Sequence, residues 1–172
     1  MQVNHFEFSD NEVISKSTLI DLVNINNNEY IELLLKNGAD PNIQDSYNYT
    51  ALHYAVVNGN YQCVKLLLKN GADPNIQNIY NYTPLHYTAI NGNAGCAKLL
   101  LKYNADLNIQ DLFKGNPLHY ASSTGHLNCI KLFLKNGADY NVEDFFKYTA
   151  LDYAIINEHK ECIELLKKYQ SN

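Results

Sequence analysis

The most constraining feature of this chain is a four-residue block that recurs every 33 residues. Its copies occupy residues 50–53, 83–86, 116–119 and 149–152, and read Thr-Ala-Leu-His, Thr-Pro-Leu-His, Asn-Pro-Leu-His and Thr-Ala-Leu-Asp. The four cysteines keep the same step, at Cys63, Cys96, Cys129 and Cys162. A fixed period of this length indicates stacked copies of one small unit, each of which buries its apolar face only against its neighbours. The sequence therefore predicts a repeat array rather than a domain with one central core.

The unit at residues 78–110 shows how one copy is expected to fold. Thr83 before Pro84 is an N-cap residue followed by proline at the first helical position, which is a strong helix start. Further along, apolar residues follow the i, i+3, i+4 spacing of a second helix as far as Lys102. Asn104 then stands where other copies have glycine, as expected for a left-handed helix end. Both helices are too short to be stable alone, so stacking must stabilise them.

These motifs resemble the ankyrin repeat. The likeness lies in the Thr-Pro-Leu-His opening, a mid-unit glycine, a Leu-Leu pair near the end of the second helix and a Gly-Ala-Asp-x-Asn close. The resemblance implies an all-α ankyrin-repeat solenoid of helix-turn-helix units with short β-hairpin-like loops. It divides the chain into an N-terminal lead (1–11), a degenerate N-terminal capping repeat (12–44), three ankyrin repeats (45–77, 78–110 and 111–143) and a C-terminal capping ankyrin repeat (144–172).

One departure from the family concerns the hairpin turns. The family favours glycine there, whereas this chain has Asn48, Asn81, Lys114 and Lys147. Asparagine tolerates a positive φ angle, but lysine does so less readily. Gly115, one residue along, can shift the turn in its repeat.

The resemblance implies that partners contact the hairpin tips and the exposed side of the first helices. The tip residues singled out are Tyr47, Tyr49, Ile79, Tyr80, Tyr82, Leu112, Phe113, Phe145, Phe146 and Tyr148, and the helix residues are Val57, Asn58, Ile90, Asn91, Ser123 and Thr124. Exposed apolar patches generally mark interfaces, and aromatic residues are enriched in them. We interpret the chain as a protein–protein interaction module that binds another protein through these residues. The alternative is that the rings only stack on one another and stiffen the hairpin row.

A second regular feature is a stripe of lysines at i, i+4 spacing on the second helices. It comprises Lys65, Lys69, Lys98, Lys102, Lys131 and Lys135. Such stripes are usually solvated faces, and lysine near a helix C-terminus is favoured by the helix dipole. As a function, this convex stripe would bind an acidic protein or a nucleic acid, which is the alternative to partner binding at the tips.

The histidine column at His53, His86 and His119 invites comparison with metal ligands. Equivalent atoms of stacked helices lie about 8–10 Å apart, whereas zinc needs its nitrogen ligands at about 2 Å. The ankyrin resemblance instead assigns this histidine to hydrogen bonds that tie adjacent loops. The cysteine column fails as a metal site for the same geometric reason, so we expect no bound metal.

Composition narrows the remaining possibilities. The net charge is −5 and all 13 basic residues are lysine, which argues against nucleic-acid binding. No stretch approaches the roughly 20 apolar residues of a membrane helix, and no set of nucleophile, base and orienting group emerges from the sequence. We therefore expect a monomer with no membrane contact, no cofactor and no enzymatic activity. The four cysteines occupy equivalent positions in successive repeats and do not form closely spaced pairs. This indicates reduced thiols and an intracellular, reducing compartment, the cytoplasm of the producer or of a host cell.

Overall fold

The computed structural model describes residues 16–171, with side chains from Leu19 onward. Over this range the chain forms ten helices and no strand, apart from an isolated bridge between Gln44 and Thr50. The helices are α1 Lys16–Asn24, α2 Asn28–Lys36, α3 Ala51–Val57, α4 Tyr61–Lys69, α5 Pro84–Asn91, α6 Ala94–Lys102, α7 Pro117–Ser123, α8 Leu127–Lys135, α9 Ala150–Ile156 and α10 Lys160–Gln170. The lead expected at 1–11 lies outside the described residues, and the repeat boundaries stay predictions.

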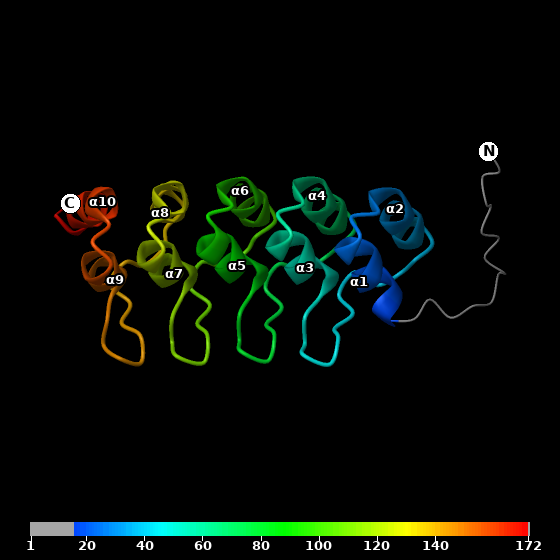
Figure 1. Cartoon of the computed structure of the whole chain (residues 1–172), viewed down its shortest axis with the longest axis horizontal. Helices are drawn as coiled ribbons and strands as arrows, with labels where there is room; N and C mark the ends of the chain where they lie inside the picture. Colours follow the sequence, from blue (N-terminus) through cyan, green and yellow to red (C-terminus); the bar gives the residue numbers. More distant parts are fainter. Residues whose placement is uncertain (1–15, 172) are drawn as a thin grey trace.

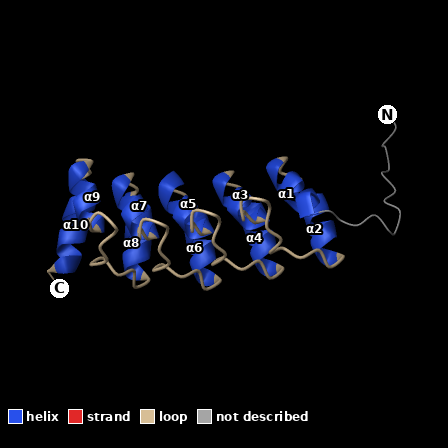
Figure 2. Cartoon of the chain, turned by 90° about the horizontal axis from the view of Figure 1, so that it is seen from below, coloured by secondary structure: helices blue, strands red, loops and turns tan. Residues whose placement is uncertain are grey.

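The helices are stacked in two layers, with a row of loops on one side (Figure 1). Each odd-numbered helix packs against the odd-numbered helix of the next repeat, from α1 to α9, and the even-numbered helices follow the same order from α2 to α10. Seen from below, the helix pairs lie side by side along one axis (Figure 2). This arrangement confirms the all-α solenoid of helix-turn-helix units.

The helix ends follow from the repeated residues. Thr50 is the N-cap of α3, and its hydroxyl accepts a hydrogen bond from the backbone N–H of His53. The loops between paired helices need a left-handed residue, which is Gly59 with φ of 65° in one repeat. Asn104 adopts φ of 63° after α6, as expected where the other repeats have glycine.

The core runs along the whole stack between the two layers. Each repeat contributes a leucine from its first helix, such as Leu52, Leu85 and Leu118, and the three are fully buried. The four cysteines are also buried and lie among these side chains. Since every one of these residues recurs at the 33-residue step, each repeat buries the same apolar face against its neighbours.

The histidine column ties each repeat to the next. Nδ1 of His53 accepts a hydrogen bond from the backbone N–H of Thr50, so the ring proton lies on Nε2, which donates to the carbonyl of Tyr82 at 3.1 Å. His86 makes the equivalent bond to Gly115 at 3.3 Å. The hydrogen-bonding role that the resemblance implied for these histidines is therefore present.

The shift of the turn that Gly115 made possible does not occur. Lys114 takes the left-handed conformation with φ of 62°, as Asn48 does at 59°. The backbone bond from Asp111 N to Gly115 O also matches the bond from Asp45 N to Tyr49 O in an earlier hairpin. The turn keeps the same register because Asp111 Oδ1 accepts hydrogen bonds from the backbone N–H groups of Phe113 and Gly115.

Candidate functional site

Each hairpin is held by one polar side chain at its base. Asp45 Oδ1 accepts the backbone N–H groups of Tyr47 and Tyr49, both at 2.9 Å, while its Oδ2 accepts the hydroxyl of Tyr54 at 2.7 Å. The equivalent residues in the next three repeats are Asn78, Asp111 and Asp144, and each also accepts two backbone N–H groups through Oδ1. These contacts fix the hairpin backbone and therefore the directions of the side chains at its tip.

Backbone hydrogen bonds join neighbouring hairpins near their tips. The backbone N–H of Ile79 donates to the carbonyl of Tyr47 at 3.1 Å, and Phe145 N donates to Phe113 O at 2.8 Å. A third bond, from Leu112 N to Tyr80 O at 3.3 Å, links the two middle hairpins. The row of four hairpins is thus a connected surface rather than a set of independent loops.

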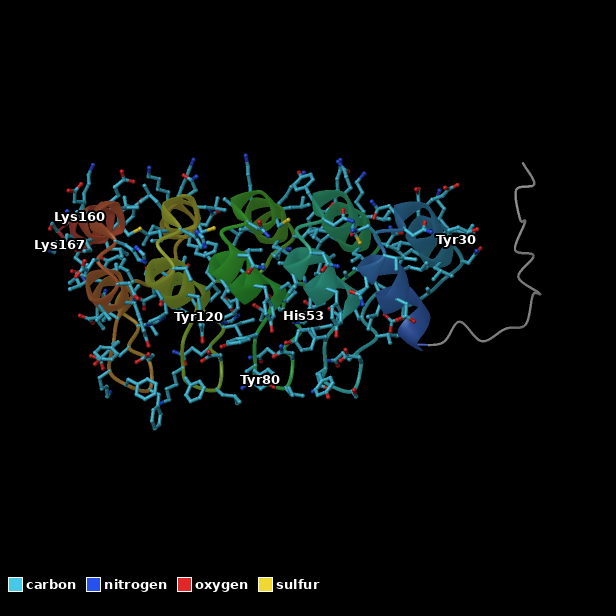
Figure 3. All side chains as sticks on the ribbon, viewed as in Figure 1. Tyr30, His53, Tyr80, Tyr120, Lys160 and Lys167 are labelled. Atoms are coloured by element: carbon cyan, nitrogen blue, oxygen red, sulfur yellow. The ribbon has the colours of Figure 1, made fainter. Side chains whose placement is uncertain are left out.

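One aromatic ring at the same position of each hairpin faces solvent. We call Tyr47, Tyr80, Phe113 and Phe146 the crest column; their side chains are 59%, 51%, 57% and 57% exposed. Figure 3 shows Tyr80 at the far end of its hairpin, away from the helices. The neighbouring tip residues Ile79, Leu112 and Phe145 are exposed as well. The crest column and these neighbours place exposed apolar side chains on each of the four hairpins, and we call them the apolar strip.

The predicted tip set is divided by a second column. Tyr49 and Tyr82 are half-buried, because their rings turn toward the first helix of the next repeat. The hydroxyl oxygens of Tyr49 and Tyr87 lie 2.5 Å apart, and those of Tyr82 and Tyr120 lie 2.9 Å apart. Tyr148, the last member of this column, is exposed. Tyr49 and Tyr82 therefore contribute to repeat stacking and offer little surface to a partner.

A row of tyrosines on the first helices completes this network, and it was not singled out from the sequence. Tyr54, Tyr87, Tyr120 and Tyr153 each follow the histidine-type position of the repeat. Burial, and next the hydrogen bond to Asp45, raise the pKa of Tyr54 to about 12, so its phenol stays protonated and donates. Burial likewise raises the pKa of Tyr120. The signal that could have found this row is its recurrence at the 33-residue step.

The predicted first-helix residues lie at the ends of α3, α5 and α7. Val57, Asn58, Asn91 and Thr124 are exposed, while Ile90 and Ser123 are half-buried. The Thr124 hydroxyl donates to the carbonyl of Tyr120 at 2.7 Å, so part of its polarity is satisfied within the chain. The exposed members comprise one apolar residue, Val57, and three uncharged polar residues.

Ring stacking, the alternative role of the crest residues, occurs at one place. Phe113 and Phe146 stack with centroids 6.2 Å apart and planes inclined by 20°. Among the ring contacts of the described residues, Tyr47 has none with Tyr80, and Tyr80 has none with Phe113. Stacking along the crest column is thus confined to the last two hairpins.

The lysine stripe lies on the second helices, on the opposite side from the hairpins. All six of its lysines are exposed. Glu29 and Glu32 of α2 line a shallow hollow of about 390 Å³ together with Lys65 and Lys69. A hydrogen bond from Lys36, and next its charge, lower the pKa of Glu32. Carboxylates therefore offset part of the positive charge at this end of the stripe.

The four thiols are free and buried. Burial raises the pKa of Cys63 to about 12 and that of Cys129 to about 11. Buried, protonated thiols are poor nucleophiles and poor metal ligands. Within residues 16–171, no three histidine, cysteine, aspartate or glutamate side chains are grouped so as to hold a metal ion.

The described helices include none long and apolar enough to cross a membrane.

The family model described as "Ankyrin repeats (3 copies)" matches the chain twice, over residues 19–111 and 85–172. The matched segments overlap and together span the repeat array that the helices form. The chain therefore belongs to the ankyrin-repeat family.

Proposed function

We propose that the chain binds a partner protein through the crest column, the neighbouring tip residues and the exposed ends of the first helices. Ankyrin repeats generally mediate protein binding and are typically non-catalytic scaffolds. The observation that carries the finer proposal is the apolar strip of half-exposed rings, which the core does not need. Four exposed aromatic rings, one on each of four successive hairpins, are a large apolar surface outside the helical core.

The rigidity of the hairpins supports the same proposal. The clamp of Asp45 and its equivalents fixes each hairpin, and backbone bonds join neighbouring hairpins. A preorganised surface loses little conformational entropy when it binds, so more of the interaction energy appears as affinity. Free, buried thiols are consistent with a reducing compartment, and we place the binding event inside a cell.

The test compares crest and stripe variants with the same partner. Partners are captured with the full chain, and their dissociation constants are then measured by calorimetry for wild type, Tyr80→Ala and a variant with all four crest rings changed to alanine. We expect Tyr80→Ala to weaken binding about 30-fold, as for a hot-spot residue worth about 2 kcal/mol. The Lys98→Ala, Lys102→Ala double variant is the matched control and should bind as wild type does.

The outcome that contradicts the proposal is normal affinity in the four-fold crest variant with an unchanged thermal unfolding midpoint. A steep loss of affinity with rising salt, together with weaker binding by the double lysine variant, would instead favour the lysine stripe.

A further inference from the structure

Residue 115 interrupts an otherwise regular column of tyrosines. The equivalent residues in the two preceding repeats are Tyr49 and Tyr82, and the equivalent residue in the following repeat is Tyr148. Gly115 is buried, and its φ angle is not in the left-handed region, so the backbone itself does not require glycine. What glycine changes here is the space between two repeats.

Tyr82 shows what a ring does at this position. Its centroid lies 5.4 Å from His86, 5.6 Å from Tyr87 and 5.4 Å from Tyr120 of the following repeat. One step of 33 residues further along, the equivalent neighbours of Gly115 are His119, Tyr120 and Tyr153. His119 and Tyr153 contact each other with centroids 6.0 Å apart, as His86 and Tyr120 do at 5.9 Å, but position 115 supplies no ring to pack beside them.

A cavity of about 190 Å³ lies at this place. Its lining includes Gly115 and the three equivalent neighbours, His119, Tyr120 and Tyr153, together with the stacked crest rings Phe113 and Phe146. An apolar cavity of about 150 Å³ is large enough to hold benzene. The cavity therefore has the volume, and the aromatic walls, that one phenol ring requires.

The polarity of the cavity favours a ring with a hydroxyl group. The Tyr153 hydroxyl donates to Asp144 Oδ2 at 2.5 Å, and burial raises the pKa of Tyr153 to about 12, so at neutral pH it remains protonated. Since its proton is committed to Asp144, its oxygen is left to accept. In the described part of the chain, the Tyr153 hydroxyl has no partner besides Asp144.

The preceding repeat has the complete version of this arrangement. The Tyr120 hydroxyl donates to Asp111 Oδ2, so in the 2.9 Å contact between the two hydroxyl groups it is Tyr82 that donates to Tyr120. A phenol in the cavity at Gly115 can donate to Tyr153 in the same way.

We propose that this cavity binds the side chain of a tyrosine from a partner protein, whose ring takes the position that the Tyr82 ring takes one repeat earlier. The inference rests on the proposed function, because the cavity is continuous with the crest column through Phe113 and Phe146. It adds one buried anchor of stated chemistry to that surface, and central, well-packed aromatic anchors are the residues that dominate interfaces.

The test uses p-cresol, the side chain of tyrosine, as the probe on the full chain. We expect saturable shifts of amide signals around residues 113–120 and 144–148 in nuclear magnetic resonance spectra, with a dissociation constant on the order of 1 mM for so small a ligand. Toluene, which lacks the hydroxyl group, should bind several-fold more weakly. Equal or tighter binding of toluene would overturn the assignment to tyrosine.

Two variants identify the site. Gly115→Tyr should fill the cavity from within the chain, remove the p-cresol response and raise the thermal unfolding midpoint. A Cβ atom at this position would lie 3.3 Å from Cε2 of Tyr120, a contact that a small shift of that ring relieves. Tyr82→Gly should do the reverse and create a second p-cresol site beside Tyr87 and Tyr120. This variant keeps the test decisive if Gly115→Tyr does not fold.

The proposal is overturned if wild type shows no saturable shift, if Gly115→Tyr responds as wild type does, or if Tyr82→Gly gains no second site. None of these measurements needs a partner, so they leave the crest variants as a separate test of the proposed function. Conversely, p-cresol binding with normal partner affinity in the crest variants would count against the proposed function alone.

Discussion

At the scale of single residues, the helix caps show how one side-chain atom affects a buried hydrogen-bond network. Thr83 has its hydroxyl oxygen 2.9 Å from Nδ1 of His86, and it can donate to that nitrogen. Asn116 stands in the equivalent place, where its Oδ1 accepts the backbone N–H groups of Leu118 and His119. This orientation leaves Asn116 Nδ2 buried without a hydrogen-bond partner. Turning the amide over would satisfy that nitrogen and lose the two backbone bonds.

We therefore predict that Asn116→Thr stabilises the protein by about 1 kcal/mol, the low end of the penalty for an unsatisfied buried donor. Both positions precede a proline, so Thr83→Asn is a matched reverse change and should destabilise by a similar amount. Urea unfolding followed by circular dichroism measures both. If Asn116→Thr is less stable than wild type, the unpaired Nδ2 atom of Asn116 does not destabilise the fold, and the prediction is contradicted.

At the scale of elements, the four hairpin turns share one backbone geometry but have different residues at the left-handed position. Asn48 and Asn81 occupy it with φ of 59° and 60°, and Lys114 and Lys147 occupy it with φ of 62° and 67°. Asparagine adopts this conformation more readily, because its short polar side chain can form hydrogen bonds with the nearby backbone, whereas the lysine side chain forms no such bond. The two lysine hairpins thus carry backbone strain that the side-chain clamps of Asp111 and Asp144 hold in place.

Lys114→Gly should relieve this strain and stabilise the protein by roughly 0.5–1 kcal/mol, after the entropy that glycine loses on folding is subtracted. Asn81→Gly, the same change in the preceding hairpin, should gain less. Thermal unfolding of the two variants gives the comparison. An equal gain in both would mean that lysine is no more strained than asparagine.

The helical stack could be predicted from the sequence because its determinants are local and repeated. The caps at Thr50 and Thr83, and the left-handed end at Asn104, each depend on residues within a few positions. The half-burial of Tyr82 could not be predicted in this way, because its ring direction depends on Tyr120 of the next repeat. The cavity beside Gly115 depends on two repeats at once, although the missing tyrosine is visible in the 33-residue step.

At the scale of the whole molecule, the histidine column makes stability depend on pH. Burial lowers the pKa of His53 and of His86 to about 4, against an ordinary value of about 6.5. Burial also lowers the pKa of His119. Between these two values the unfolded chain binds protons that the folded chain does not. The stability contributed by neutral histidines is therefore complete above about pH 6.5 and is lost as the pH falls toward 4.

We expect the free energy of unfolding to fall by about 1.4 kcal/mol per pH unit for each of His53 and His86 across this window. Urea midpoints measured from pH 7 to pH 4.5 test the slope. His86→Gln removes one titrating ring. The slope of its unfolding free energy against pH should therefore be shallower by about 1.4 kcal/mol per pH unit, even though the variant is less stable overall. A flat profile, or an unchanged slope in His86→Gln, would contradict this account.

The placement of one buried thiol in each of four successive repeats has a practical consequence. Because Cys63, Cys96, Cys129 and Cys162 occupy equivalent depths, a thiol reagent can reach each of them only when its own repeat opens. Mass spectrometry of the labelled peptides would then record the order in which segments of the natural chain come apart. The protein carries its own evenly spaced reporters, and no foreign probe has to be introduced.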